Sequence, residues 1–313
     1  MTITTFAIEY DAINSSNTFT NGDTINGRIV VEASKETRIQ SLIFIGQGEA
    51  RVRWSEHYGE YYHNVYWQNE KYYQIKHCIL RESRQDGWSL AKEDTFSPFH
   101  SKSLTGMKIP STFTAPIGKV IHKLKAELKQ SMKLTKKAKT HFTFVSKPYM
   151  EIPGLMDPQH GCKDKSLAFS SGNLSMDVFT DRMGYKQGEA VRVTLEITNR
   201  SGRSVRPKFT LYEKQSFFAQ GKRRVHTHDI LKEKAEAVER SKKETVTQVI
   251  NLPMELPSSI LNCSIIKLEY RLKVKSILLC LRNTAVVAFP AFGGWPPSRL
   301  HLFHASHTEM RRL

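Results

Sequence analysis

Alternation of apolar and polar residues is the strongest regular pattern along this chain. In the segment GDTINGRIVVE, apolar side chains fall at Ile25, Ile29 and Val31, with polar residues between them. A period of two is typical of a β-strand with one buried face. The same alternation returns in the second half, most plainly in IIKLEYRLKV (265–274). The pattern therefore predicts antiparallel strands without helical crossovers.

One stretch of this pattern occurs twice. FTNGDTINGRIVVE (19–32) and YKQGEAVRVTLEI (185–197) align at a constant shift of 166 residues, and each starts with an aromatic residue and a Gly-acid turn. The alignment continues past the next loop without a gap. The aligned pairs are Phe19–Tyr185, Gly22–Gly188, Asp23–Glu189, Ile25–Val191, Ile29–Leu195, Val31–Ile197, Ile39–Val205, Ile43–Phe209 and Ile45–Leu211.

A second repeated motif lies further along each half. KIPSTF (108–113) precedes the alternating segment VIHKLKAEL, and ELPSSI (255–260) precedes IIKLEYRLKV. Generic resemblance among β-sandwich sequences is the alternative explanation, but the shared order of four features argues against it. The sequence thus predicts an all-β protein of two tandem immunoglobulin-like sandwiches.

Composition shifts predict the domain limits. KPYMEIPGLMDPQHGCKDK (147–165) carries three prolines and two glycines and has no periodicity, which is typical of a linker. We expect a first domain at 1–147, a linker at 148–165, a second domain at 166–292 and a tail at 293–313. The segment THDILKEKAEAVERSKKE (227–244) is polar on all sides and is predicted to be an exposed loop or a short helix.

The composition is that of an ordinary globular chain, with 39% hydrophobic and 25% charged residues. The first residues show no secretory signal pattern, and the longest apolar run is interrupted by Arg282 and Asn283. We therefore expect a soluble, cytoplasmic protein. The four cysteines are widely spaced, which favours free buried thiols over disulfides or a zinc site. They are Cys78, Cys162, Cys263 and Cys280.

The net charge of +17 points to anionic partners. Two basic clusters stand out. The first consists of Lys129, Lys133, Lys136, Lys137 and Lys139, and the second of Lys222, Arg223 and Arg224 in an expected hairpin turn. Each cluster is either a solvated surface that aids solubility or a contact for acidic phospholipid headgroups or phosphorylated cargo. Nucleic acid is the least favoured partner, because no binding module accompanies the charge.

No residues form a recognisable catalytic or metal-binding pattern. The glycines of GQGEAR, Gly46 and Gly48, are not followed by a helix pattern and indicate a strand turn instead of a nucleotide-binding loop. The histidines at 226, 228, 301, 304 and 307 lack Cys or acidic partners at ligand spacing, which favours surface histidines. We expect no enzymatic activity, no metal and no cofactor.

Six segments carry a resemblance to a known family. They are TFTNGDTINGRIVVE, EARVRWSEHYGE, FTFVSKPYMEIPGLMDPQHGCKDK, YKQGEAVRV, KQSFFAQGKRRV and LPSSILNCSIIKLEYRLKV. They resemble the α-arrestins, and in particular the arrestin domain-containing proteins of fishes. The resemblance implies two arrestin lobes joined by a short hinge. It also implies a non-enzymatic adaptor that binds membrane receptors and other cargo at the plasma membrane and endosomes, and directs their ubiquitination and sorting.

Two departures from the family pattern limit these expectations. The family's Gly-x-His and Pro-Phe-x-Phe strand is replaced by a stretch at 87–109 that keeps Pro98 and Phe99 but loses the alternation. Family members recruit HECT-type ubiquitin ligases through PPxY motifs, which WW domains bind. Here Pro296 and Pro297 are followed by Ser and Arg, without the Tyr. Direct recruitment of such ligases is therefore doubtful.

Two other functions stay open beside the adaptor. One is a sorting scaffold that resembles the arrestin-shaped subunit of retromer. The other is a basic β-sandwich that binds nucleic acid, and capture of partners with and without nuclease would separate it from an adaptor.

Overall fold

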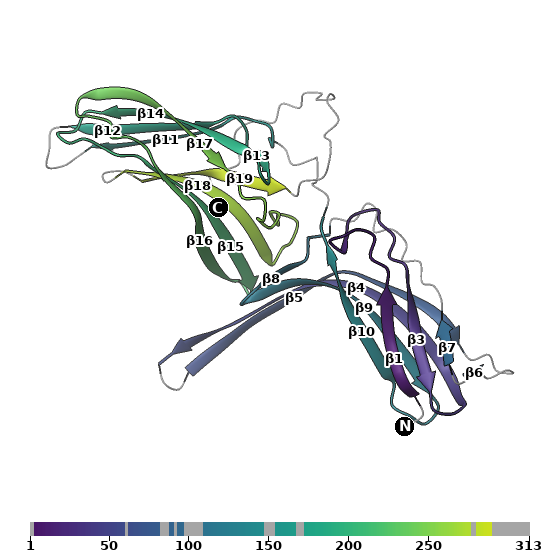
Figure 1. Cartoon of the computed structure of the whole chain (residues 1–313). Coiled ribbons are helices and arrows are strands. Elements are labelled where there is room, and N and C mark those ends of the chain that lie inside the picture. Colours follow the sequence, from purple (N-terminus) through teal and green to yellow (C-terminus); the bar gives the residue numbers. More distant parts are fainter. Residues whose placement is uncertain are drawn as a thin grey trace.

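The computed structural model describes residues 3–59, 62–81, 88–90, 93–96, 109–146, 154–166, 172–276 and 280–289. Every regular element in these ranges is a β-strand. Figure 1 shows two sandwiches, a first lobe within residues 3–146 and a second lobe within residues 154–289, and a long ribbon that projects from the middle of the molecule. The predicted all-β architecture of two tandem sandwiches is confirmed.

The first lobe is built from a three-stranded and a seven-stranded sheet. The smaller sheet has the order β1 (Ile3–Tyr10), β3 (Gly27–Ala33) and β7 (Glu93–Phe96). The larger sheet has the order β2 (Thr18–Phe19), β10 (Lys136–Phe144), β9 (Gly118–Gln130), β4 (Thr37–Tyr58) and β5 (Tyr62–Arg81), with β6 (Trp88–Leu90) beside β4 and β8 (Phe113–Ala115) beside β9. Among the described strands of this lobe, β2 alone pairs in parallel, with β10.

The stretch at 87–109, which departs from the family pattern, contributes β7 to the smaller sheet. Phe96 pairs with Ile29, and Asp94 pairs with Val31. This part of the stretch is therefore an edge strand next to β3. Pro98 and Phe99 lie outside the described residues.

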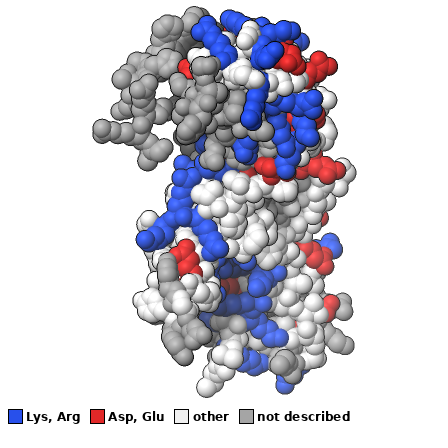
Figure 2. Space-filling view, turned by 90° about the vertical axis from the view of Figure 1, so that its left-hand side faces the viewer, with Lys and Arg blue, Asp and Glu red and all other residues white. Residues whose placement is uncertain are grey.

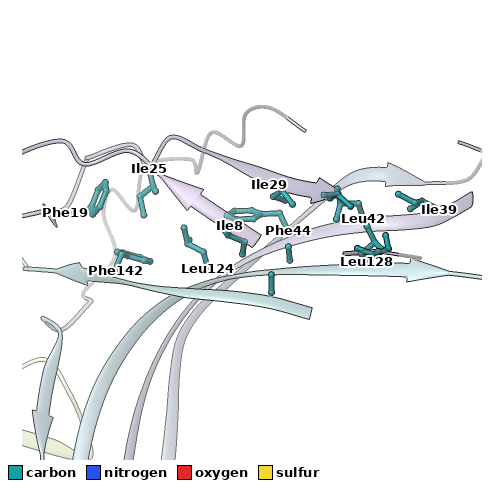
Figure 3. Close-up of a cluster of buried hydrophobic side chains, with 14 of the residues drawn as sticks. Ile8, Phe19, Ile25, Ile29, Ile39, Leu42, Phe44, Leu124, Leu128 and Phe142 are labelled. Carbon is teal, nitrogen blue, oxygen red and sulfur yellow. The ribbon is translucent and has the colours of Figure 1, made fainter. Parts of the chain in front are cut away.

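The alternating apolar residues of both sheets meet in the core of the first lobe. Ile29 and Val31 of β3 are completely buried, as is Leu42 of β4. They share one cluster with Phe44 and Leu124, and Figure 3 shows side chains of the two layers converging between the ribbons. Each such side chain contributes roughly 1.5–3 kcal/mol when it leaves water.

The second lobe repeats this arrangement. Its four-stranded sheet has the order β11 (Gln159–Ser166), β12 (Asn173–Thr180), β14 (Ala190–Asn199) and β17 (Lys242–Asn251). Its five-stranded sheet has the order β13 (Gly184–Lys186), β19 (Cys280–Phe289), β18 (Ile266–Lys275), β15 (Lys208–Ala219) and β16 (Lys222–Lys234). The short β13 runs parallel to β19, as β2 does to β10.

The repeated Gly-acid turn has the same geometry in both lobes. Gly22 and Gly188 both have a positive φ, of 96° and 77°, which glycine adopts at little cost. The Asp23 carboxylate accepts a hydrogen bond from the backbone N–H of Thr20 at 2.7 Å, and the Glu189 carboxylate accepts the equivalent bond at 2.7 Å. The acid three residues after the start of the turn therefore closes it in each copy.

Beyond the next loop, the alignment at a constant shift is wrong by one residue. Phe209 and Leu211 lie in the core of the second lobe. Ile43 and Ile45, their aligned partners, lie on the outer face of the first lobe, because the core residues there are Leu42 and Phe44. The pairing of β4 with β9 has a β-bulge between Ile39 and Ser41. One extra residue moves every following side chain to the opposite face.

Two local predictions are also corrected. The expected linker at 148–165 contains most of β11, which pairs with β12 from Gln159 to Ser166. The expected loop or helix at 227–244 contains most of β16 and the start of β17. All three strands lie at sheet edges. Edge strands are largely exposed to solvent and tolerate polar sequences. Their sequences therefore lack the apolar alternation that predicts a strand.

The second repeated motif, the Pro-Ser turn, accepts a hydrogen bond from a buried aromatic or imidazole side chain in each lobe. In the first lobe, His122 Nε2 donates to the carbonyl oxygen of Pro110 at 3.1 Å, and Nδ1 accepts from the Tyr73 hydroxyl at 3.0 Å. In the second lobe, the Tyr270 hydroxyl donates to the carbonyl oxygen of Pro257 at 2.7 Å. In each lobe, a ring thus connects the Pro-Ser turn to the long strand that follows it, β9 in the first lobe and β18 in the second.

The buried His122 predicts a loss of stability in mild acid. His122 is completely buried, and burial lowers its pKa from 6.5 to about 4. Between these values the unfolded chain binds the proton and the folded chain does not, so this contribution is complete above pH 6.5 and falls as the pH drops towards 4. From pH 7 to pH 5, we expect a loss of about 2 kcal/mol in the free energy of unfolding.

The matched variant is His122→Gln, whose amide keeps one donor and one acceptor but does not titrate. Urea unfolding of both proteins at pH 7 and pH 5 checks the prediction. Equal pH dependence in the two proteins would contradict it.

The two lobes share a third apolar cluster, which we call the seam. Phe217 of β15 is completely buried in it, together with Val52 and Trp54 of β4. A Cβ atom on Gly118 would lie 2.5 Å from Cε1 of the Phe217 ring, so the start of β9 needs glycine for the lobes to approach. The remaining buried members are Ala50, Phe113, Val120, Ala219, Ile260, Cys263, Ile265, Ile266 and Leu268.

A hydrogen-bonded carboxylate lies beside the seam. Glu70 of β5 accepts from the Ser264 hydroxyl at 2.7 Å and from its backbone N–H at 3.1 Å. The Tyr72 hydroxyl donates to the same oxygen at 3.1 Å. This carboxylate thus joins the first lobe to the segment that leads into β18.

The ribbon consists of the ends of β4 and β5. β9 begins opposite Val52, and beyond that point β4 pairs with β5, from Arg53–Trp67 to Tyr58–Tyr62. On one face Trp54 stacks on Tyr66 at 5.3 Å, next to the seam. On the other face Trp67 is 56% exposed.

Candidate functional site

The outer face of the seven-stranded sheet gathers lysines from three strands. Along β9, Leu124 and Ala126 point into the core. Lys123, Lys125 and Glu127 alternate with them and point outwards. The outward residues of the neighbouring strands follow from the pairing register. Beside Lys123, the lysines that share this surface, which we call the cationic face, are Lys71, Lys76, Lys125, Lys137 and Lys139.

One row of the cationic face brings like charges together. Lys139 of β10 stands opposite Lys125 of β9, and Lys125 stands opposite Ile45 of β4. Ile45 in turn stands opposite Lys76 of β5. Partial burial lowers the pKa of Lys125, and the positive charge of nearby Lys123 lowers it further, against the opposing charges of Glu49 and Glu127. Like charges directly opposite each other destabilise a sheet, so this row favours binding of an anion.

The next part of the face contains a buried ion pair. Lys123 forms a short hydrogen-bonded contact with Glu49, and both side chains are more than nine-tenths buried. Arg51 also contacts the Glu49 carboxylate, at 2.7 Å, and Gln47 donates to it at 3.1 Å. Burial acts to raise the pKa of Glu49, but the hydrogen bond and charge of Lys123 outweigh it, so the pKa lies below its usual value.

Two carboxylates thus offset part of the positive charge. Glu49 is held by Lys123 and Arg51, and Glu127 stands opposite Lys137. The row of Lys76, Lys125 and Lys139 contains no acid. In Figure 2, Lys and Arg occupy the lower, hollowed part of the surface, at the height of the first lobe in Figure 1, and others gather over the upper part. The face is thus net positive and is suited to an extended acidic segment.

The structure divides the first predicted cluster between three places. Lys137 and Lys139 lie on the cationic face, and Lys129 is exposed at its end on β9. Lys133 lies in the turn between β9 and β10. Lys136 is partly buried and donates to the carbonyl oxygen of Ile3 at 2.6 Å. Spacing in the sequence grouped residues that the β-hairpin separates.

The expected hairpin turn lies at Gln220 and Gly221, and the second predicted cluster follows it as the first three residues of β16 instead of lying in the turn. Lys222 is exposed. Arg223 donates to the Ser216 hydroxyl at 3.0 Å and lies over the Phe218 ring. Arg224 donates to the carbonyl oxygen of Ser55 in the ribbon at 3.4 Å. Two of its three cations thus make contacts within the molecule, and an anion-binding role for this cluster stays a prediction.

The other predicted features are outside the site. Among the described residues, no cluster of His, Cys, Asp and Glu has a metal-binding arrangement, and no helix is long and apolar enough to span a membrane. His226 and His228 lie on β16. Cys78 and Cys162 are exposed free thiols, whereas Cys263 is buried as expected. The tail motif, Pro296 and Pro297, lies outside the described residues.

Sequence reasoning missed the central lysines of the face. Lys123 and Lys125 alternate with buried residues in VIHKLKAEL, so their shared face was readable from the period of two. Lys76 had no such signal. It reaches the same row only through the register of β4 with β5, nearly fifty positions away along the chain.

The chain is similar to known arrestin-domain proteins over most of its length. Residues 6–150 match the N-terminal domain of arrestin (or S-antigen), and residues 170–291 match its C-terminal domain. Arrestin domain-containing protein 4 of Mus musculus is 24% identical over 270 residues, which are 83% of this chain and 65% of that protein. The Homo sapiens protein of the same name is 24% identical over 266 residues, 82% of this chain and 63% of that protein.

A second relative has a different name. Thioredoxin-interacting protein of Homo sapiens is 22% identical over 260 residues, which are 81% of this chain and 65% of that protein. The chain thus spans less than two thirds of the length of these relatives. The two domain matches fall on the two lobes, in the same order as the observed sandwiches. The chain therefore belongs to the arrestin family, in its α-arrestin branch.

Proposed function

We propose that this protein is a non-enzymatic adaptor that binds acidic or phosphorylated cytoplasmic segments of membrane receptors and other cargo, for endocytic or endosomal sorting. The row of Lys76, Lys125 and Lys139 carries the proposal, because it holds three cations and the nearby acids, Glu49 and Glu127, lie in the neighbouring rows. Phosphate and carboxylate oxygens are the partners that lysine and arginine bind most strongly. In this proposal the protein acts in the cytoplasm, at the plasma membrane and at endosomes.

The family supports the adaptor role, and the shape of the face favours an extended ligand. The outer face of a sheet offers rows of side chains about 5 Å apart. A flexible acidic segment can follow these rows and contact several lysines at once. Direct recruitment of HECT-type ubiquitin ligases is not part of the proposal, because Pro296 and Pro297 lack the Tyr of a PPxY motif.

Replacing the three lysines of the row tests the proposal. We expect Lys76→Gln/Lys125→Gln/Lys139→Gln to weaken binding of a phosphoserine-rich peptide by about tenfold or more, since three exposed or partly exposed charge contacts are lost at up to about 1 kcal/mol each. Fluorescence anisotropy at low and physiological salt measures the affinity.

The matched control removes three exposed lysines of the second lobe, Lys234→Gln/Lys242→Gln/Lys267→Gln, and changes the net charge equally. If the control weakens binding as much as the test variant, the charge acts without a specific site and the proposal fails. Preferential binding of RNA or DNA over the phosphopeptide would instead favour the nucleic-acid alternative.

A further inference from the structure

The turn between β9 and β10 exposes two apolar side chains completely. Met132 has a relative exposure of 103% and Leu134 of 93%. The next most exposed large hydrophobic residues in the described part of the chain are Met254 at 66% and Tyr62 at 64%. Single exposed apolar residues are common on protein surfaces, but two fully exposed ones within three positions at a convex tip need an explanation.

The base of this turn is fixed, which keeps the two side chains outside. The Gln130 side chain donates to the Thr37 hydroxyl at 2.9 Å on one side. Lys136 donates to the carbonyl oxygen of Ile3 at 2.6 Å on the other side. Met132 has a φ of 54°, in the left-handed region that methionine rarely adopts. The backbone therefore holds the tip in a defined, strained shape.

Positive charge surrounds the two apolar side chains. Lys133 lies between them in sequence, and Lys129 and Lys137 are exposed on the strands that lead to the turn. Ile39 pairs with Gln130, so the turn between β3 and β4 lies beside the tip. That turn adds Lys35, and Arg38 follows at the start of β4. Glu36 in the same turn and Glu127 on β9 are the nearby acids, so the surrounding charge stays positive.

We propose that this tip, Met132 to Leu134, inserts into the headgroup region of an anionic membrane. Apolar side chains flanked by lysines bind such a surface by two additive effects, burial at the acyl boundary and attraction to anionic headgroups. Two separate side chains on a convex tip offer no groove for another protein. A bilayer accepts them without one, and its negative charge complements the flanking lysines.

The shape of the molecule allows this contact. In Figure 1 the turn between β9 and β10 and the end of the ribbon both reach the lower side of the molecule, with the second lobe above them. Tyr62, at the end of the ribbon, is 64% exposed, and tyrosine is enriched at membrane interfaces. A membrane below the molecule is therefore in reach of both projections. This inference is independent of the cargo proposal, which concerns the outer face of the sheet.

Vesicle binding by the full chain tests the tip. We expect the chain to sediment with phosphatidylcholine vesicles that contain phosphatidylserine, and less with pure phosphatidylcholine. Met132→Ser/Leu134→Ser should lower the partition coefficient by about tenfold to a hundredfold, because two partly inserted side chains are lost. Lys35→Gln/Lys133→Gln, which leaves the cationic face unchanged, should weaken binding at low salt and have a smaller effect at high salt.

The control variant is Val249→Ser/Met254→Ser, which removes two exposed apolar side chains of the second lobe. A second readout is quenching by lipids brominated along the acyl chain, which should be stronger for Leu134→Trp than for the unmodified chain. Unchanged vesicle binding of Met132→Ser/Leu134→Ser, or an equal loss in the control, overturns the proposal. The phosphopeptide affinity of the tip variant should stay unchanged, which separates this test from that of the cargo site.

Discussion

Phe217→Ala is expected to lower the free energy of unfolding by about 3–5 kcal/mol and to loosen the two lobes from each other. Phe217 is completely buried in the seam, between residues of the first and second lobes. Its ring contacts the start of β9 so closely that Gly118 leaves no room for a side chain. Truncation would leave a cavity between two rigid sheets, which cannot collapse to fill it.

Urea unfolding and limited proteolysis measure this effect. The seam variant should unfold at lower urea, and its two lobes should separate into distinct transitions if the seam couples them. Phe218→Ala is the matched control, because Phe218 is the next residue of the same strand, is only partly buried and points to the opposite face, beneath Arg223. Equal losses for the two alanine variants would refute a special role of the seam.

Glu49→Ala is expected to destabilise the first lobe by a similar amount, about 3–5 kcal/mol, because it leaves Lys123 charged, buried and unpaired. The side chains of both residues are less than one-tenth exposed, so solvent screens the pair weakly. The pKa of Glu49 lies below its ordinary value of 4.5. The stability from this group is therefore present above pH 4.5 and is lost as the pH falls below it.

The double variant Glu49→Leu/Lys123→Met provides the comparison. Replacing both partners of a buried ion pair by apolar residues is often neutral or stabilising. We expect the double variant to recover most of the stability that Glu49→Ala loses, as measured by thermal unfolding at pH 7. Recovery would show that the cost lies in the unpaired Lys123 and not in the lost volume. A double variant as unstable as the single one would contradict this explanation.

These two predicted losses of stability concern buried contacts that position the candidate binding surfaces. The seam positions the ribbon next to the second lobe, and the Glu49–Lys123 pair lies within the cationic face. A variant that unfolds the protein at either contact would also lose binding, so binding tests need the folding measurements beside them. The lysine row and the tip consist of exposed or partly exposed side chains, and their variants should leave folding nearly intact.

Local sequence determined the strands and turns whose stabilising contacts lie close along the chain. The alternation at Ile25, Ile29 and Val31 requires one buried face, whatever lies opposite. The Gly-acid turns at Gly22 and Gly188 are each closed by a hydrogen bond within four residues. Their geometry could therefore be predicted from the local sequence in both copies. The tandem sandwiches followed from these repeated local patterns.

Tertiary structure decided the features that depend on pairing between distant strands. The bulge between Ile39 and Ser41 adds one residue to β4, so the side chains that follow it point to the opposite face from the one that the repeat alignment predicts. Only the pairing of β4 with β9 shows this extra residue. The polar strand β11 forms because β12 offers it an edge. Lys76 joins Lys125 and Lys139 only through two registers across the sheet. Alternation specifies which residues share a face of one strand, but long-range hydrogen bonding alone sets which strands lie side by side and in which register.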